Sequence, residues 1–196
     1  LRGKAQASAQ TATWTLAGGV NGNNFSSEGQ ASFSGTVPNL KAQARFEKLD
    51  LNALLPADKS APSSGPAAAD TAVDLAALRR LNGVFNLRAG SFAFKQYRVA
   101  DAVLEAALDA GVLRVSSLQG KVWGGSVDAS ALADARASRV ALKATASGVN
   151  VNAMLKDVAG RDILEGSGRV VADIDSAGRS VGELRSRLHG TAALQL

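Results

Sequence analysis

The feature that most constrains this chain is a period-two alternation of apolar and polar residues in several separate segments. It is clearest from Leu40 to Phe46 (LKAQARF), from Leu104 to Asp109 (LEAALD) and from Arg169 to Asp175 (RVVADID). Successive side chains of a β-strand point to opposite faces, so each segment has one apolar and one polar face. This pattern predicts antiparallel strands that are covered on one side only.

Turn signals separate these segments at short intervals. They are Gly18-Gly19, Asn21-Gly22, Pro38-Asn39, Ala110-Gly111 and Gly124-Gly125. The segments Val103–Ala110 and Val112–Ser117 predict a hairpin with a tight turn at Gly111. The predicted fold class is therefore mainly β, a curved antiparallel meander sheet with a few short helices.

Few segments favour a helix. Residues 75–81 predict one after Asp74, and Ser180 to Glu183 (SVGE) fits a capping box in which the two side chains satisfy orphan backbone N–H groups. Asn52 and Asn152 are candidate N-caps of short helical turns.

An internal repeat links two distant parts of the chain. Residues Leu40–Leu55 align without a gap on Val140–Leu155, including a shift of alternation phase between Phe46 and Leu49. Such a shift predicts a bulge or bend. The repeated unit is then strand, bend, short helix and strand, used twice to make one continuous one-sided surface.

The amino-acid composition gives only a weak indication of separate segments along the chain. Residues 56–74 are rich in Pro, Ala and Ser and predict a flexible loop between an N-terminal β segment, 1–55, and a β-rich segment, 75–196. We expect one continuous domain. The chain starts at Leu1 without a signal-peptide pattern or a spanning apolar run, so we expect it to be excised from a longer protein.

Few residues of the sequence are candidates for a catalytic, metal-binding or phosphate-binding site. The chain has no cysteine, and its single histidine, His189, has no nucleophile motif near it. The DIDSAG segment from Asp173 to Gly178 begins like a calcium loop, but Ala177 and Leu184 stand where ligands are required. The Gly-rich segments lack the spacing of a phosphate-binding loop. We therefore expect no enzyme activity, no cofactor and no metal.

The net charge is +5, and the segment from Leu75 to Ala100 contains basic residues and no acid. Two interpretations stay open: a solvated face, or a surface for anionic headgroups formed by Arg88, Lys95 and Arg98. Nucleic acid is not an expected partner, because the segment has no recognisable reading motif.

An apolar cluster accompanies these basic residues. If neighbouring strands align, one face carries a floor of large apolar side chains, with Glu105, Asp109 and Arg114 pointing away. The candidate lipid-binding residues are Phe85, Leu87, Phe92, Phe94, Leu104, Leu108, Leu113 and Val115. The floor is either a closed core or an open groove for an acyl chain.

Several motifs resemble the C-terminal region of the AsmA family. They are FNLRAGSF from Phe85, the hairpin from Val103 to Val115, LQGKVWGGS from Leu118, GVNVNAML from Gly148, GSG from Gly166, SAGRS from Ser176 and LHG from Leu188. The resemblance covers residues 40–196. Trp123 stands where a tyrosine is common in the family.

This resemblance implies a function and a location. AsmA-like proteins are anchored in the inner membrane of Gram-negative bacteria by an N-terminal helix, which would be absent from this chain, and their bulk lies in the periplasm. They are tied to outer-membrane biogenesis, and larger relatives resemble grooved bridges that move phospholipid between membranes. The expected function is to hold or conduct phospholipid along the apolar groove. The alternative is a non-enzymatic scaffold that affects outer-membrane protein assembly by sheet-edge pairing.

Overall fold

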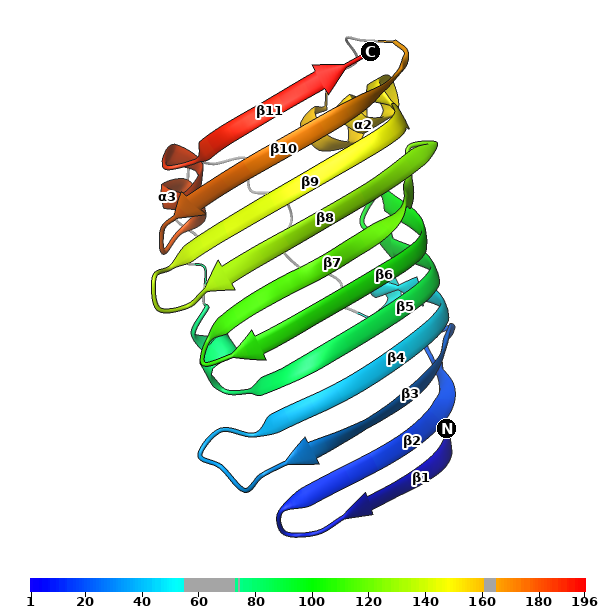
Figure 1. The fold of residues 1–196 in the computed structure, drawn as a ribbon. Helices are drawn as coiled ribbons and strands as arrows, with labels where there is room; N and C mark the ends of the chain where they lie inside the picture. The colour runs from blue at the N-terminus through cyan, green and yellow to red at the C-terminus, as the bar shows by residue number, and fades with distance from the viewer. Residues whose placement is uncertain (55–72, 74, 161–164) are drawn as a thin grey trace.

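The computed structural model describes residues 1–54, 73, 75–160 and 165–196, and in them it shows one curved, open sheet of eleven strands (Figure 1). The strands follow one another in sequence order. They are β1 (Arg2–Ala7), β2 (Thr11–Val20), β3 (Asn23–Ser32), β4 (Asn39–Asp50), β5 (Asn82–Phe94), β6 (Tyr97–Asp109), β7 (Val112–Val122), β8 (Gly125–Asp134), β9 (Arg139–Asn150), β10 (Ser167–Ala177) and β11 (His189–Gln195). The mainly β prediction is confirmed.

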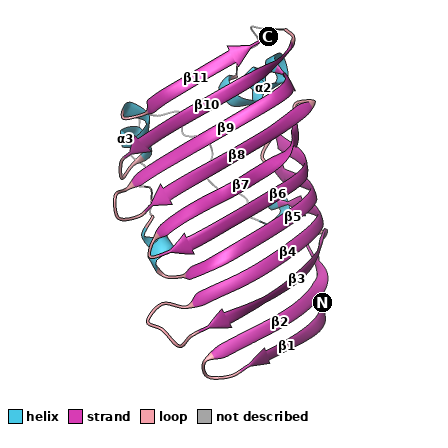
Figure 2. Ribbon diagram, viewed as in Figure 1, coloured by secondary structure: helices cyan, strands magenta, loops and turns pink. Residues whose placement is uncertain are grey.

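The described helices are short and lie at the ends of the strands (Figure 2). They are α1 (Leu51–Leu54), the 3-10 helix η2 (Ala76–Arg79), α2 (Val151–Ala159) and α3 (Val181–Ser186). The predicted loop 56–74 lies outside the described residues except for Val73, whose backbone N–H donates to the Arg179 carbonyl at 2.9 Å.

One neighbouring pair departs from the predicted antiparallel meander. Strand β4 runs parallel to β5, with Ala42 opposite Phe85, while the other neighbouring pairs are antiparallel. A parallel neighbour requires the chain to return to the end of the sheet where it started, which a tight turn cannot do. Residues 51–81 separate the two strands in the sequence, which is enough chain for that return. Local alternation is the same for both strand directions, so it did not reveal the parallel pair.

The alternation produces two chemically different faces. Directly opposite residues share a face, so the register can be followed from β1 to β11. One such row, which we call the unbroken row, contains no charged side chain, although the indole N–H of Trp14 donates to the Ser27 hydroxyl at 3.1 Å. The row consists of Ala5, Trp14, Gly29, Ala42, Phe85, Ala106, Val115, Ala131, Leu142, Ile174 and Gly190. We call the face with this row the apolar face, and the opposite one the polar face.

The hairpin prediction at Gly111 is confirmed. Ala110 and Gly111 have φ of 48° and 84° between β6 and β7, and Asn21-Gly22 and Trp123-Gly124 have the same left-handed pair of conformations. Two residues with positive φ form the turn whose twist matches that of paired strands, and glycine adopts it without a steric penalty.

The repeat is confirmed over the described residues; Leu55 lies outside them. Strand β9 and helix α2 begin exactly one hundred positions after β4 and α1. The phase shift also recurs: two exposed residues separate Phe46 from Leu49, which is 5% exposed, and two separate Ala146 from Val149, which is fully buried. In each copy the apolar residue that follows the bend is buried: Leu49 in the first and Val149 in the second.

The structural repeat is longer than the sequence match. Gly18 pairs with Phe25, and Phe25 with Phe46, in β2–β3–β4. In β7–β8–β9, Gly120 pairs with Val127, and Val127 with Ala146. The copies diverge only after their helices, where β10 returns antiparallel to β9 and β5 lies parallel to β4.

Two helix predictions need correction. Asn52 and Asn152 are not the caps: Asp50 Oδ1 accepts from the Asn52 N–H at 3.1 Å, and Asn150 Oδ1 accepts from the Ala153 N–H at 2.9 Å. Each helix begins directly at its strand end, so the capping position falls two residues earlier.

Helix α3 starts at the predicted Ser180, whose hydroxyl accepts from the Glu183 N–H at 3.2 Å. The Glu183 carboxylate accepts from the N–H of Arg179 rather than of Ser180, at 2.8 Å. The helix predicted over 75–81 is one short 3-10 turn.

The core gathers at one end of the apolar face. Leu49, Ala89 and Ala102 are buried together, and Phe46, Leu51, Leu54, Leu87, Phe92 and Val99 pack against them. Leu51 and Leu54 come from α1, so this helix closes the end of the sheet near the bend. The rest of the apolar face extends away from this cluster.

Candidate functional site

Most of the predicted apolar residues lie together on the apolar face. Leu87 of β5 is directly opposite Leu104 of β6. Phe85 and Val115 flank Ala106 from either side in the unbroken row, and Leu108 pairs with Leu113. Glu105, Asp109 and Arg114 are exposed on the opposite face.

The two remaining aromatic residues have different surroundings. Phe92 packs against the buried cluster at the bend and therefore belongs to the closed core. Phe94 is the last residue of β5, where the Lys95 ammonium lies 5.5 Å from its ring centroid. Neither continues the central floor.

The apolar face has closed and open parts. Leu108 is only 7% exposed and lies near the β6–β7 turn, where Arg79 of η2 donates to the Ala135 carbonyl at 2.8 Å. Leu118 of β7, in contrast, is 43% exposed although it lies on the same face, between Leu104 and Ala129. The floor is therefore closed at Leu108 and open at Leu118.

Leu118 is the residue that the sequence reasoning missed. A register shift between Val115 and Leu118 places two serines where the alternation predicted one residue, so Leu118 returns to the apolar face. The doublet Ser116-Ser117 between two apolar residues was the available signal, and it resembles the shift after Phe46.

Helices α1 and α2 connect the hairpin tips at one end of this face. Asn52 of α1 accepts from the Lys95 N–H at 2.7 Å, and the Ala53 carbonyl accepts from the Asn21 side chain at 2.9 Å. Asp157 of α2 accepts from the Tyr97 hydroxyl at 3.2 Å and from the Trp123 indole N–H at 2.8 Å. These contacts hold the tips of β2–β3, β5–β6 and β7–β8 in a fixed arrangement.

The three residues predicted to contact a headgroup, Arg88, Lys95 and Arg98, do not lie together. Arg88 and Arg98 lie on the polar face, because their neighbours Leu87 and Val99 are on the apolar one. A lipid whose chain lies on the apolar face would have to reach around the strand ends to meet them. Lys95, at the β5–β6 turn, is the one of the three beside the apolar face.

In the described residues, no group of three or more His, Cys, Asp or Glu is arranged to hold a metal ion. None of the helices described is long and apolar enough to cross a membrane.

The comparisons with known proteins agree with the motifs. The family model described as the AsmA family matches residues 4–196. Neither the curated proteins nor the solved structures compared with this chain gave a match. Because the family model covers nearly the whole chain, the chain belongs to the AsmA family, which is associated with proteins of the bacterial envelope.

Proposed function

We propose that this chain holds or conducts phospholipid in the periplasm, with acyl chains lying along the apolar face, and that it contributes to outer-membrane biogenesis without catalysing a reaction. One observation carries the proposal. A row without a charged side chain crosses all eleven strands, and on the same face Leu118 remains 43% exposed.

The dimensions of the apolar face suit this role. Ten strand spacings of about 4.8 Å make a face of about 48 Å, whereas each half of a bilayer's hydrocarbon core is about 15 Å thick. The face is thus about three acyl chains long. A chain could move along it while remaining in contact with apolar side chains.

Part of the apolar face remains open to a ligand. Leu118 and its neighbours Leu104 and Ala129 are not among the buried residues. Covering exposed apolar side chains removes apolar area from water, which is worth about 25 cal/mol per Å². Large exposed apolar surfaces mark interaction sites in soluble proteins.

The location follows from the family rather than from the fold. We propose that the protein is held at the inner membrane, with the sheet in the periplasm. Phospholipid is then the expected partner, because both membranes supply it.

Matched variants at two exposed apolar residues test the proposal. Leu118→Asp puts a charge on the apolar face, and Val84→Asp puts the same charge on the polar face, where the native residue is 45% exposed. A photo-crosslinking amino acid at Leu104 reports bound phospholipid by mass spectrometry. We expect Leu118→Asp to abolish the phospholipid adduct and Val84→Asp to retain it.

Both variants should keep the β-sheet circular dichroism of the native chain, since neither site is buried. The proposal is wrong if the native chain gives no adduct, or if the two variants lose it equally.

A separate observation favours the alternative function, a scaffold that affects outer-membrane protein assembly. Strands β1 and β11 form the two edges of the sheet, and all their residues are exposed. An exposed edge can accept a strand from another protein. In cells lacking the native protein, a scaffold would still function with Leu118→Asp, whereas a lipid-holding sheet would not.

A further inference from the structure

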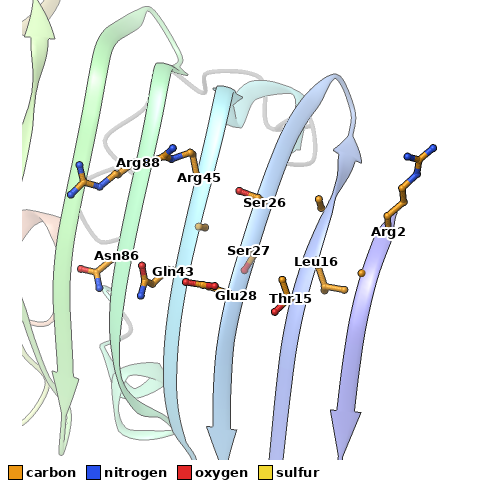
Figure 3. Close-up of a pocket in the computed structure, with 13 residues that line it drawn as sticks. Arg2, Thr15, Leu16, Ser26, Ser27, Glu28, Gln43, Arg45, Asn86 and Arg88 are labelled. Atoms are coloured by element: carbon orange, nitrogen blue, oxygen red, sulfur yellow. The ribbon is translucent and has the colours of Figure 1, made fainter.

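Two arginines lie side by side on the polar face without a compensating carboxylate. Arg45 of β4 is directly opposite Arg88 of β5 in the parallel pair, and both side chains are exposed. Figure 3 shows them on neighbouring strands. Within the described part of the chain, neither has an ion pair or a hydrogen bond from its side chain.

This arrangement is unfavourable for the isolated sheet, because like charges directly across a strand pair repel each other. Carboxylates lie only in the next row of this face: Glu28 beside Gln43, and Glu105 beside Asn86. Neither forms an ion pair with Arg45 or Arg88 in the described part of the chain. Both arginines line a hollow of about 540 Å³ together with Arg2 of β1, and Glu28 is the carboxylate that lines it. Glu28 pairs with Gln43, one row away from Arg45 (Figure 3).

The other half of the polar face is arranged differently. Lys143 of β9 contacts Asp173 of β10 at 2.9 Å, and Arg139 contacts Asp175 at 3.3 Å. These two cations are matched by carboxylates on the neighbouring strand.

Strands β1 to β5 carry a cationic excess. Their cations are Arg2, Lys4, Lys41, Arg45, Lys48 and Arg88, and their acids are Glu28, Glu47 and Asp50. Lys48 lies 3.9 Å from Asp50, whereas the arginine pair has no such neighbour. The positive charge is therefore spread over several of these strands, and the arginine pair lies on the two strands farthest from the β1 edge.

We propose that the polar face of β1–β5 docks on a membrane surface rich in anionic phospholipid, with Arg45 and Arg88 as the central contacts. Charge complementarity identifies the partner: guanidinium groups bind phosphate oxygens strongly, and a bilayer presents phosphates over the whole width of the patch. The exposed cations lie on an open surface that suits an extended partner better than a single enclosed anion. This docking does not depend on the lipid-holding proposal, because it uses the opposite face of the sheet.

Vesicle binding tests the docking. The whole chain is sedimented with vesicles of phosphatidylcholine alone and with vesicles of equal parts phosphatidylcholine and phosphatidylglycerol. We expect binding to the anionic vesicles, weakened by salt. Arg45→Gln/Arg88→Gln should bind about 30-fold more weakly, from about 1 kcal/mol per basic residue at a membrane surface.

Matched controls separate this patch from general positive charge. Arg169→Gln removes an exposed cation from the polar face of β10 and should bind nearly as the native chain does. Arg45→Lys/Arg88→Lys keeps the charge and should retain most of the binding. Leu118→Asp should also retain it, even where it abolishes the phospholipid adduct.

Several results would overturn the docking proposal. These are no preference for anionic vesicles, equal loss in Arg169→Gln and the double Gln variant, or loss in the Lys variant as large as in the Gln variant. Equally tight binding of a soluble acidic polymer such as polyglutamate would also contradict it, since the partner would then be an acidic chain rather than a membrane.

Discussion

The indole N–H of Trp123, at the tip of the β7–β8 hairpin, donates to Asp157 Oδ2 of helix α2 at 2.8 Å. The two residues are 34 positions apart, and their contact fixes the helix across the hairpin end. The carbonyl of Asp157 also accepts from Tyr97 of the β5–β6 hairpin, at 3.2 Å. One residue of α2 thus joins two hairpins at the end of the apolar face.

Removing this link should loosen α2. We expect Trp123→Phe to lower the free energy of unfolding by about 1.5–3 kcal/mol, because the hydrogen bond to the Asp157 carboxylate is lost together with part of the ring. Chemical denaturation measures the loss. Asp157→Ala should add little further destabilisation in the Trp123→Phe background; full additivity in this double-mutant cycle would show that the two side chains do not interact.

A second prediction concerns Asn23, which is 1% exposed at the start of β3. Its Oδ1 accepts from the Asp50 backbone N–H at 2.5 Å, and its Nδ2 donates to the Val20 carbonyl at 3.2 Å. Asn23→Ala should cost about 1–3 kcal/mol, because a backbone N–H near the bend loses its partner. Asn24→Ala, next to it and exposed, is the control for thermal unfolding and should change stability by less than about 0.5 kcal/mol.

Substitution by aspartate should destabilise the fold at Leu108 but not at Leu118. Leu108→Asp buries an unpaired carboxylate at a site that is 7% exposed and should cost several kcal/mol, enough to unfold much of the chain. Leu118→Asp, at a site 43% exposed, should leave the fold intact. Circular dichroism and urea titration distinguish them, and equal stability of the two variants would contradict the division into closed and open parts.

The lowered pKa of Asp134 predicts that the stability of the chain depends on pH. Hydrogen bonds from the backbone N–H groups of Ala137 and Arg136, at 3.1 and 2.8 Å, lower the pKa of this carboxyl in the β8–β9 turn. A folded-state pKa below the unfolded one stabilises the protein above the unfolded pKa, and this contribution is lost as pH falls through the folded pKa. Asp134→Ala should therefore be less stable than the native chain at neutral pH, with a gap that narrows below about pH 4.

Denaturation curves of both proteins at neutral and acidic pH measure this gap. A gap that stays constant down to about pH 2 would show that the Asp134 charge contributes nothing to the turn.

Several of the strands, the chemical character of their faces, the hairpin at Gly111 and the hundred-residue repeat could be predicted from the sequence by itself. These features are local: alternation fixes which side chains share a face, and the turn residues fix where strands end. The candidate floor could be predicted for the same reason, since Leu87, Leu104 and Val115 alternate in phase within their own strands.

Which strands are neighbours, in which direction they run and which parts of the floor are covered became visible in the three-dimensional structure alone. The parallel pairing of β4 with β5 depends on a crossover that alternation cannot report, and it brings Arg45 opposite Arg88, although 43 residues separate them. Burial is also a property of the assembled sheet. Leu108 and Leu118 are both apolar strand residues, but η2 lies near the β6–β7 turn beside the first, while a bulge returns the second to an open part of the face. The doublet Ser116-Ser117 indicates the bulge locally, but contacts between residues distant in sequence determine which strands pair and which parts of the floor are covered.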